Sequence, residues 1–496
     1  MSIYLELDGQ GEMYRQLLRA LRQAMAEGRL PVGTRLPSTR ALAEQLGIAR
    51  NTVLLAYEML CAEHLAVSKV GSGTYVVRPP RHAPDPPAEL AIEPPSRFAR
   101  RLRETDTHWF RDPGKHLRFN LQYGTPVVDM GLFAAWGRAL AHAAERTDAA
   151  YPPTQGVEAL RVEIASYLGR RRGLACEPDD VMVVNGTQQA INLISRVLLD
   201  EGDHVVMEDP SFKLARNHFA VHGAEVSFVP VDDEGLRVDL LPKQSAKLIY
   251  VTPSHQYPSG VQMTRQRRHD LLAVARERGS WILEDDYDGE FGLEGRLEPA
   301  LASLTPKARV LYVGSFSKVL LPSIRLGYIV APASIRDDLL KAKLLGDIAS
   351  PGIEQAALAH FMRSGGFERH LRRAAAELRR RRAALRAAVQ RWCPDDVLLD
   401  DKGVGMHCVA WLPGLEQPDV RALIEVAAAQ GLGLHSINSQ YLVKPRHQGL
   451  LLGFASLSVA QLGSAIELLS RCLAQVKAAR SHDPWPAGKQ ACAPAA

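Results

Sequence analysis

The chain of 496 residues is too long for a single hydrophobic core, so we expect two or three domains. Its apolar content of 46% and charged content of 23% are ordinary for a globular protein, and a net charge of +5 over this length does not by itself indicate a nucleic-acid binder. The six cysteines form no Cys-x-x-Cys pair and no Cys/His cluster, so we expect no metal site and a reducing, cytoplasmic environment. Acidic residues (Glu6, Asp8, Glu12) lie where an export signal would be basic and then apolar, and no apolar run reaches membrane-spanning length, so we expect no membrane partner.

The N-terminal segment, residues 1–78, has the pattern of a small domain with three helices and a hairpin. Ser38 is a suitable N-cap for the second helix, and a glycine-rich tip joins the two strands of the hairpin. The expected elements are helices from Met13 to Glu27, from Ser38 to Gly47 and from Arg50 onward, then strands Leu65–Lys69 and Thr74–Val77. This order is typical of a winged helix-turn-helix domain.

A winged helix-turn-helix places the first turn of its third helix against base edges in the major groove. In that turn, Arg50 can form two hydrogen bonds to guanine, and Asn51 or Thr52 can reach a base or a phosphate. Arg35 and Arg40 flank the start of the second helix and would lie over the phosphate backbone. The alternative is a small helical domain with solvated arginines, because the segment has nearly as many acids as bases.

A more specific signal is the string GRLPVGTRLPSTRALAEQLGIARNTVLLAYEMLCAEHLAVSKVGSGTYV, from Gly28 to Val76. It resembles the GntR-type DNA-binding domain almost throughout. The resemblance implies that four positions contact double-stranded DNA, namely Arg40, Arg50, Thr52 and Gly71. Two positions depart from the family: Ala49 replaces the hydroxyl residue that usually caps the third helix, and His64 occupies a turn position where glycine is usual.

The next segment, residues 79–118, is rich in proline and lacks a sustained helical or alternating pattern, so we expect a semi-rigid, extended linker. Part of the linker, Ser96 to Arg103, could form a short helix. At the other end of the chain, residues 481–496 are rich in alanine and proline and are expected to be disordered. These boundaries leave residues 119–480 as the second domain.

In this second domain, short apolar runs alternate with amphipathic helices, which is typical of an α/β domain with a mostly parallel sheet. Polar or aromatic residues follow several of the runs, at the strand ends where ligands of α/β sheets collect. The runs and the residues after them are Val181–Val184 with Gly186 and Thr187, His204–Met207 with Phe212, Lys247–Val251 with Gln256 and Tyr257, and Trp281–Leu283 with Asp285 and Tyr287. The Gly-Thr turn offers backbone N–H groups to a phosphate at a helix N-terminus, although an ordinary strand-to-helix turn can have the same sequence.

The stretch LYVGSFSKVLLPSIRLG, from Leu311 to Gly327, carries the most specific chemistry. An apolar run precedes Ser315, Ser317 and Lys318, and Arg325 follows seven residues after the lysine. An aldehyde cofactor with a phosphate could form a Schiff base with this amine while the hydroxyls and guanidinium bind the phosphate. The alternative is a solvent-exposed lysine in a serine-rich loop.

The acidic string EDDYD, from Glu284 to Asp288, bears on the same choice. Carboxylates at the end of a buried strand are costly unless one of them meets a cation. The protonated pyridine nitrogen of pyridoxal phosphate is such a cation, and an aspartate is its expected partner. Taken alone, the string also fits a solvated acidic turn.

Several strings together are specific to one group of proteins: VTPSHQYPSG, EDDYDGEF, GSFSKVLLPSIRLGY, IEQAAL, ERHLRR and LLLGFASLS. They resemble fold-type-I aminotransferases, and with the GntR-type head the whole chain resembles the MocR/GabR group of bacterial transcription regulators. The implied fold is a multidomain α/β protein: a winged helix-turn-helix followed by a PLP-dependent transferase fold of type I. In that fold, helices cover both faces of the central sheet, and a smaller α+β subdomain lies C-terminal.

The resemblance also implies a role for each site residue. Lys318 would form the Schiff base with pyridoxal 5'-phosphate, Asp285 would pair with the pyridine nitrogen, Tyr287 would bond the phenolic oxygen, and Phe212 would stack on the ring. The phosphate would be held by Gly186, Thr187, Ser315 and Arg325, with Ser317 beside them. Gln256 and Tyr257 lie where aminotransferases often place an asparagine near the phenolic oxygen. The group implies a homodimer, arranged head to tail.

One expected feature of an aminotransferase is missing. An arginine that binds the substrate carboxylate usually precedes an apolar pair such as Gly453-Phe454, but here Leu450, Leu451 and Leu452 occupy that run. The remaining anion contacts are Lys213, Arg216 and Arg446. We therefore expect a regulator that senses pyridoxal phosphate, or an amino acid or amine forming an external aldimine. It would control genes near its own locus, for vitamin B6 or amino-acid metabolism. The alternative is an active aminotransferase with a DNA-binding head.

Overall fold

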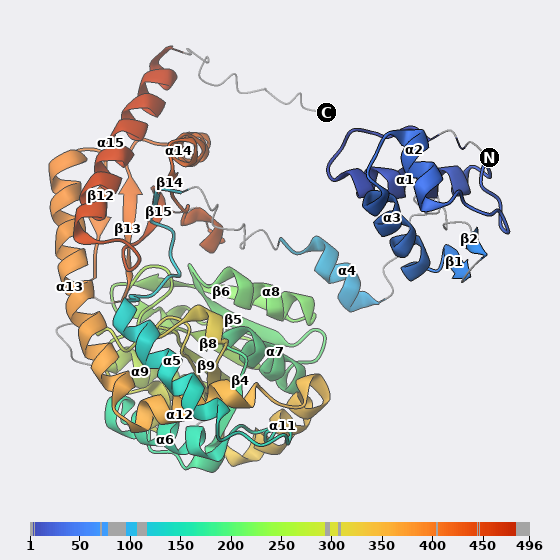
Figure 1. The fold of residues 1–496 in the computed structure, drawn as a ribbon. Coiled ribbons are helices and arrows are strands. Elements are labelled where there is room, and N and C mark those ends of the chain that lie inside the picture. The colour runs from blue at the N-terminus through green and yellow to red at the C-terminus, as the bar shows by residue number, and fades with distance from the viewer. Residues whose placement is uncertain are drawn as a thin grey trace, which may run out of the picture. The chain divides into compact units, whose positions relative to one another are not determined.

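The computed structural model describes residues 3, 5–69, 72–77, 96–106, 117–292, 298–305, 309–402, 405–443, 445 and 447–482. Two of the expected site residues, Gly71 and Arg446, lie outside the described residues. The chain forms two compact units, Met1–Glu93 and Pro94–Ala496, each with its own core (Figure 1).

The N-terminal unit has the expected winged helix-turn-helix elements. These are α1 (Met13–Ala26), α2 (Thr39–Leu46), α3 (Arg50–Ala62), β1 (Ala66–Lys69) and β2 (Gly73–Val76). The two strands pair antiparallel, and leucines at helical spacing, such as Leu17 and Leu21, are fully buried among the three helices. The Ser38 side chain accepts a hydrogen bond from the Ala41 N–H at 3.2 Å, so the predicted N-cap of α2 is confirmed.

The C-terminal unit is built on an eight-stranded sheet in the order β4-β11-β10-β9-β8-β5-β6-β7. The strands are β4 (Val181–Val184), β5 (His204–Asp209), β6 (Glu225–Asp232), β7 (Gly235–Leu236), β8 (Leu248–Val251), β9 (Trp281–Asp286), β10 (Val310–Ser315) and β11 (Gly327–Val330). β11 runs antiparallel to β4 and β10, and β7 runs antiparallel to β6, while the other neighbours are parallel. The sheet is therefore mostly parallel, as predicted.

Helices cover both faces of this sheet because its buried strands are apolar on both sides (Figure 1). Along β5, Val205 and Met207 pack in the cluster that holds α7 (Thr187–Leu198), α8 (Lys213–Val221) and α11 (Ala333–Asp347). Val206, between them, packs in the cluster of α9 (Arg265–Arg278) and α10 (Leu301–Leu304). The β4 and β11 end of the sheet packs on α5 (Met130–Ala144), α6 (Glu158–Arg172) and α12 (Gly352–Arg363).

A smaller C-terminal part packs against the long helix α13 (Gly366–Trp392). It contains an antiparallel sheet, in the order β12-β13-β15, and two helices. The elements are β12 (Leu398–Asp400), β13 (His407–Leu412), α14 (Gln417–Ala429), β15 (Gln448–Gly453) and α15 (Val459–His482), and β14 (Leu432–Gly433) pairs with β3 (Phe119–Asn120). A mostly parallel sheet covered by helices, followed by a small α+β part, is the architecture that the sequence predicts.

The segment before β3 contains a short helix, α4 (Arg97–Glu104), which Ser96 caps through the Ala99 N–H at 3.0 Å. This helix belongs to the C-terminal unit and lies against α8. No helix in the described part of the chain combines the length and the apolar character that crossing a bilayer requires.

Candidate functional site

Lys318 lies three residues beyond the end of β10, among aromatic and backbone groups. Its Nζ donates a hydrogen bond to the Gly124 carbonyl at 3.1 Å and lies 4.6 Å from the centre of the Tyr123 ring. Burial lowers its pKa from 10.5 to about 8, the Asp288 carboxylate opposes this shift, and Arg325 adds to it. The amine is therefore neutral, and able to act as a nucleophile, in roughly a tenth of the molecules at pH 7.

Close to this lysine, the turn between β4 and α7 and the loop after β10 form an anion cradle, which we define as Gly186, Thr187, Ser315, Ser317 and Arg325. The N-cap of α7 is Gly186, with φ +82°, and within the described residues the N–H groups of Thr187 and Gln188 form no backbone hydrogen bond, whereas that of Gln189 donates to the Gly186 carbonyl. Arg325 donates from Nη2 to the Asn185 carbonyl at 3.0 Å, and its Nη1 lies 3.5 Å from the Ser317 hydroxyl. Guanidinium, hydroxyls and helix N-terminus together suit a phosphate.

Two glycines make this close approach possible. A Cβ at Gly186 would lie 2.9 Å from Nη2 of Arg325, and a Cβ at Gly327 would lie 2.8 Å from the Gly314 carbonyl. Any side chain at Gly186 would also be strained at its positive φ. The close approach of Arg325 therefore requires glycine in this turn, which is not the case in an ordinary strand-to-helix turn.

Strand β9 continues through Asp286, beyond the predicted end at Leu283, and its acids are buried. The prediction of the strand end was wrong because these acids find partners within the protein. Glu284 accepts hydrogen bonds from the Leu301 and Ala302 N–H groups at 2.8 and 3.0 Å, and Asp286 forms an ion pair with Arg172 at 2.8 Å. A solvated acidic turn is thereby excluded.

One carboxylate oxygen of Asp285 has no hydrogen-bond partner among the described residues. Oδ2 accepts a hydrogen bond from the Tyr250 hydroxyl at 2.7 Å, whereas Oδ1 is buried without a hydrogen-bond partner among the described residues. Burial raises the pKa of this carboxyl from 3.8 to about 7; the Tyr250 hydrogen bond lowers it, and Asp286 and Asp288 raise it further. A cation at Oδ1 would relieve the cost of this buried charge.

An aromatic cluster formed by Tyr123, Phe212, Tyr257 and Tyr287 adjoins the lysine. Ring centres of Tyr257 lie 5.6, 5.7 and 5.8 Å from those of Phe212, Tyr123 and Tyr287, and the Tyr287 hydroxyl lies 3.1 Å from Nδ1 of His255. Leu451, which is fully buried in β15, packs in the same cluster. Apolar side chains therefore occupy the run where an aminotransferase would carry its carboxylate-binding arginine.

The cofactor contact of Gln256 stays a prediction, and its amide has several partners within the protein. Its amide nitrogen donates to Glu208 at 3.2 Å, to the Pro210 carbonyl at 2.6 Å and to its neighbour's carbonyl at 2.8 Å. Its amide oxygen accepts from the Ser259 hydroxyl at 2.6 Å. Both ends of the amide are thus committed to protein partners, and Gln256 holds the loop that carries Tyr257.

The described anion contacts lie on the first turn of α8 and differ in their partners. The Lys213 ammonium forms an ion pair with Asp106. The Arg216 guanidinium is half-buried, burial lowers its pKa against the opposing effect of Asp209 and Asp106, and it forms no hydrogen bond or ion pair within the described part of the chain. Arg216 also follows Phe212 by four residues, which places both on one face of the helix.

Sequence reasoning missed Tyr123, Gly124, Tyr250 and His255. Tyr123 and Gly124 lie almost two hundred positions before Lys318 and belong to no motif, so no local signal could have identified them. His255 stands inside the string VTPSHQYPSG and could have been singled out as a polar residue after a buried strand.

In the N-terminal unit, the expected DNA contacts lie on the surface. Arg50 is the first residue of α3, with its Nε 3.3 Å from the Thr39 hydroxyl, and Asn51 is exposed beside it. Thr52 is half-buried, and Arg40 is exposed on α2. Arg35 forms a backbone bridge with Tyr75 in the hairpin. As expected from Ala49, no side chain caps α3, and His64 adopts a positive φ of 56°.

Comparisons with known proteins agree with both units. The family of bacterial regulatory proteins of the gntR type matches residues 13–76, and aminotransferase class I and II matches residues 119–420. The "Probable rhizopine catabolism regulatory protein MocR" of Rhizobium meliloti is 34% identical over 94% of this chain and 95% of its own length. The "HTH-type pyridoxine biosynthesis transcriptional regulator PdxR" of Corynebacterium glutamicum is 32% identical over 89% and 91%. The chain belongs to the MocR-type family of GntR regulators.

Among solved structures, this MocR-type regulator is similar in its C-terminal unit to aminotransferases. The α-aminoadipate aminotransferase LysN of Thermus thermophilus, complexed with N-(5'-phosphopyridoxyl)-L-leucine, has a TM-score of 0.67 at 28% identity, over 74% of this chain and 94% of that one. The kynurenine aminotransferase of Pyrococcus horikoshii, in complex with PMP, has a TM-score of 0.66 at 27% identity, over 73% and 92%.

The protein is therefore a DNA-binding transcriptional regulator with pyridoxal 5'-phosphate as its cofactor and a small molecule as its effector. The site fits this cofactor in two respects. The unpartnered Oδ1 of Asp285 suits a protonated ring nitrogen, and the anion cradle, where Gly186 leaves room for the guanidinium of Arg325, suits a phosphate.

Proposed function

We propose that this protein uses its aminotransferase-like unit as a sensor: occupation of the Lys318 site changes how the dimer binds DNA. The observation that carries this proposal is a contrast within one site. Lys318, Asp285 and the anion cradle are intact, whereas Leu451 packs among tyrosines where a substrate carboxylate would need a cation. Burying a carboxylate against such apolar groups is costly, so general transamination of α-amino acids is disfavoured.

The proposed roles of the site residues follow from their contacts. Lys318 supplies the amine that binds the cofactor aldehyde, and Oδ1 of Asp285 holds the ring nitrogen in its charged form. The anion cradle holds the phosphate, Tyr287 donates to the phenolic oxygen, and Phe212 packs on the ring. Pyridoxal phosphate supplies an aldehyde that condenses with amines, and that chemistry makes the site sensitive to the cofactor itself or to an amine.

The effector is the cofactor alone or an amine that reacts with it. Should the effector carry an acidic group, Arg216 is its contact, because its guanidinium is half-buried, lacks a partner among the described residues and lies on the Phe212 face of α8. Lys213 already has a counter-ion in Asp106. An acidic effector near Lys213 would therefore compete with Asp106 for this ammonium.

This competition suggests how the site communicates with the linker. Helix α4 lies within the predicted linker range, and α4 and the residue Asp106 after it contact both ends of α8. Arg101 donates to the Val221 carbonyl at 3.2 Å and pairs with Glu201 at 3.0 Å, and Asn217 donates to the Asp106 carbonyl at 3.1 Å. Since Phe212 is the N-cap of α8, movement of this residue on ligand binding would shift the helix that holds α4. The position of α4, from which the chain runs back through the linker to the DNA-binding unit, would then change.

A homodimer, arranged head to tail, completes the proposal. Large apolar side chains on α5, on α11 and between α5 and α6 are exposed in the isolated C-terminal unit, and a second copy would cover them. They are Met130 (80% exposed), Phe133 (52%), Tyr151 (84%) and Leu345 (83%). Two DNA-binding units per dimer would read two half-sites about 10 base pairs, or a multiple of this, apart. Their target, genomic DNA, places the protein in the cytoplasm.

The test is DNA binding to the intergenic region beside the gene itself, with and without pyridoxal phosphate and candidate amines. We expect ligand to change the affinity of the wild type and not that of Lys318→Ala, which cannot bind the aldehyde. Multiple-turnover transamination of common amino acids, together with no binding to this DNA, would instead establish an aminotransferase with a DNA-binding head. Equal DNA affinity with and without every ligand would refute the sensor.

A further inference from the structure

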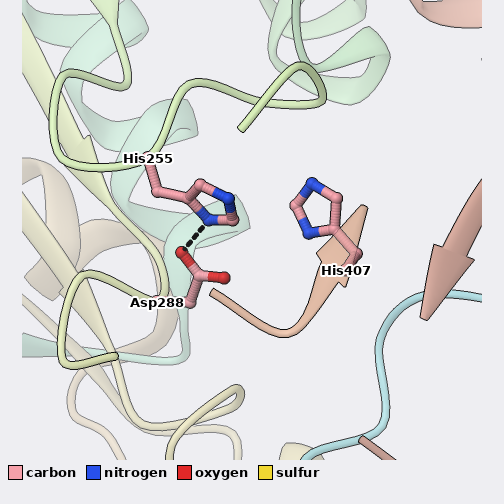
Figure 2. A group of neighbouring side chains, drawn as sticks. All are labelled: His255, Asp288 and His407. Carbon is pink, nitrogen blue, oxygen red and sulfur yellow. Dashed lines mark hydrogen bonds and ion pairs between the residues drawn. The ribbon is translucent and has the colours of Figure 1, made fainter. Parts of the chain in front are cut away.

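Asp288, His255 and Tyr287 are linked by hydrogen bonds that meet at one nitrogen atom. Figure 2 shows the hydrogen bond between Nδ1 of His255 and Oδ1 of Asp288, which lie 2.7 Å apart. The Tyr287 hydroxyl lies 3.1 Å from the same nitrogen, and the two rings lie at 28° to each other with centres 5.7 Å apart. His255 and Asp288 are only 2% and 1% exposed, so water competes little for these hydrogen bonds.

The shared nitrogen determines which way each hydrogen atom points. Nδ1 of an imidazole has either one hydrogen atom or one lone pair, and a carboxylate only accepts hydrogen bonds. Nδ1 of His255 therefore carries the hydrogen atom and donates it to Asp288. It then has no lone pair for the Tyr287 hydroxyl, so the oxygen of this hydroxyl accepts a second, longer hydrogen bond from the same N–H group. The hydrogen atom of the Tyr287 hydroxyl consequently points away from His255.

The hydroxyl hydrogen of Tyr287 has no acceptor among the described residues, since the contact with His255 is the only hydrogen bond of this hydroxyl there. Burial raises the pKa of Tyr287 well above its usual value of 10, and the Asp288 carboxylate raises it further, so the hydroxyl keeps its hydrogen. Tyr287 is therefore a donor whose acceptor comes from a ligand. Pyridoxal phosphate offers such an acceptor in its phenolic oxygen.

We propose that His255 and Asp288 are positioning residues for Tyr287: the carboxylate fixes the tautomer of the imidazole, and the imidazole directs the Tyr287 hydroxyl hydrogen toward the cofactor. Close backbone packing keeps the imidazole in this orientation. A Cβ at Gly405 would lie 2.8 Å from Oδ2 of Asp288 and closer still to the His255 ring, and a Cβ at Gly260 would lie 3.3 Å from Nε2 of His255. The inference rests on the proposed contact between Tyr287 and the phenolic oxygen.

The Asp288 carboxylate also acts on two cations through its charge. It opposes the effect of burial, which lowers the pKa of Lys318 to about 8 and also lowers the pKa of Arg382. A change at Asp288 therefore has two consequences for the site, one through the tautomer of His255 and one through the charge near Lys318. The experiment has to separate the two.

The first measurement determines the tautomer of His255 in the full-length protein. Proton–nitrogen correlation spectra of protein labelled at the histidine nitrogens distinguish the two tautomers, and the signal that disappears in His255→Asn belongs to His255. We expect its hydrogen at Nδ1. His370 and His407 are references in the same spectrum, because their Nε2 atoms donate to the carbonyls of Val319 at 2.8 Å and Pro258 at 3.1 Å. Hydrogen at Nε2 alone of His255 would overturn the proposal, because Nδ1 could then accept from the tyrosine.

The second measurement is a double-mutant cycle on the dissociation constant of pyridoxal phosphate, determined by absorbance. Tyr287→Phe should weaken cofactor binding about tenfold, because it removes a hydrogen bond to a charged oxygen. Asp288→Asn releases the tautomer of His255, so Tyr287 can donate to Nδ1 instead of to the cofactor. The effect of Asp288→Asn on the dissociation constant should therefore be at least about threefold more unfavourable in the wild type than in Tyr287→Phe.

The matched control is His370→Gln, because His370 is as buried as His255 and bonds a backbone carbonyl but does not contact Tyr287. It should show no coupling with Tyr287→Phe. An equal effect of Asp288→Asn in both backgrounds would overturn the proposal, because Asp288 would then act through its charge alone. If Asp288→Asn fails to fold, the tautomer of the wild type decides the question. Neither measurement contains DNA, so a sensor refuted by DNA binding leaves this result unchanged.

Discussion

Replacing Asp285 by asparagine tests two effects of this carboxylate separately: the loss of folding stability caused by its buried charge, and its proposed contact with the ring nitrogen of the cofactor. Because burial raises its pKa from 3.8 to about 7, the folded chain binds this proton more tightly than the unfolded chain does. Below pH 3.8 the carboxyl does not change the free energy of unfolding. As the pH rises from 3.8 to about 7 it lowers this free energy progressively, and above about pH 7 the effect is constant. At pH 8 the cost reaches at most about 4 kcal/mol.

Asp285→Asn removes this charge but keeps an acceptor for the Tyr250 hydroxyl. Its new amide N–H replaces the unpartnered Oδ1 and costs about 1–3 kcal/mol, since it too lacks a partner. The cofactor-free variant should therefore be more stable than the wild type by about 1–3 kcal/mol at pH 8, and this gain should vanish toward pH 5.

With cofactor the sign reverses, because the variant cannot neutralise a protonated ring nitrogen, and we expect at least about tenfold weaker cofactor binding. The matched control is Asp286→Asn on the same strand, which leaves the buried Arg172 without its counter-ion and should cost about 3–5 kcal/mol with or without cofactor. Urea denaturation at pH 5 and pH 8, with and without cofactor, and cofactor titration by absorbance measure these effects. Lower stability of cofactor-free Asp285→Asn at pH 8, or unchanged cofactor affinity, would refute the assignment.

Three further predictions concern other parts of the molecule. The rate of cofactor capture by cofactor-free protein should rise about tenfold from pH 7 to pH 9 and then level off, following the neutral form of Lys318; a hundredfold rise without a plateau would indicate an ordinary lysine. Gly186→Ala should abolish cofactor binding, because its Cβ would lie 2.9 Å from the Arg325 guanidinium, whereas Gly463→Ala, with nothing within 4 Å, should not. Arg50→Ala should weaken specific operator binding by about 1–3 kcal/mol in a gel-shift assay, and an unchanged affinity would contradict its placement at base edges.

Local patterns predicted the elements that position the site. The apolar runs at Val181, His204, Lys247 and Val310 each form a strand close to the predicted range, because a buried strand needs a continuous apolar sequence and little else. The order of polar residues after those strands was informative for the same reason: parallel strands deliver their carboxyl ends to one edge of a sheet.

The differences from the sequence-based expectations arise where a partner lies far away in the chain. Strand β9 runs on through Asp286 because Arg172, more than a hundred positions earlier, compensates that carboxylate. The amide of Gln256 donates hydrogen bonds to Glu208 and to the Pro210 carbonyl, more than forty positions earlier in the chain. The apolar surroundings that lower the pKa of Lys318 include Tyr123, which no motif marks. Such pairings depend on the assembled fold, which one-dimensional patterns do not encode.

The contacts of α8 are the ones that the proposed sensor would use. Its first residues face two ways: Phe212 packs in the aromatic cluster of the site, while Lys213 pairs with Asp106 at the end of the segment that holds α4. Further along, Gly223 has no side chain, and this lets the Arg101 guanidinium pack where a Cβ would lie 2.8 Å from it. The segment that holds α4 contacts both ends of α8, through Asp106 at one end and Arg101 at the other. If a ligand moves Phe212 and with it α8, α4 must therefore move too, or one of these two contacts must break. Under the proposed function, Lys318 and Asp285 would serve to hold the cofactor against Phe212, the N-cap of α8.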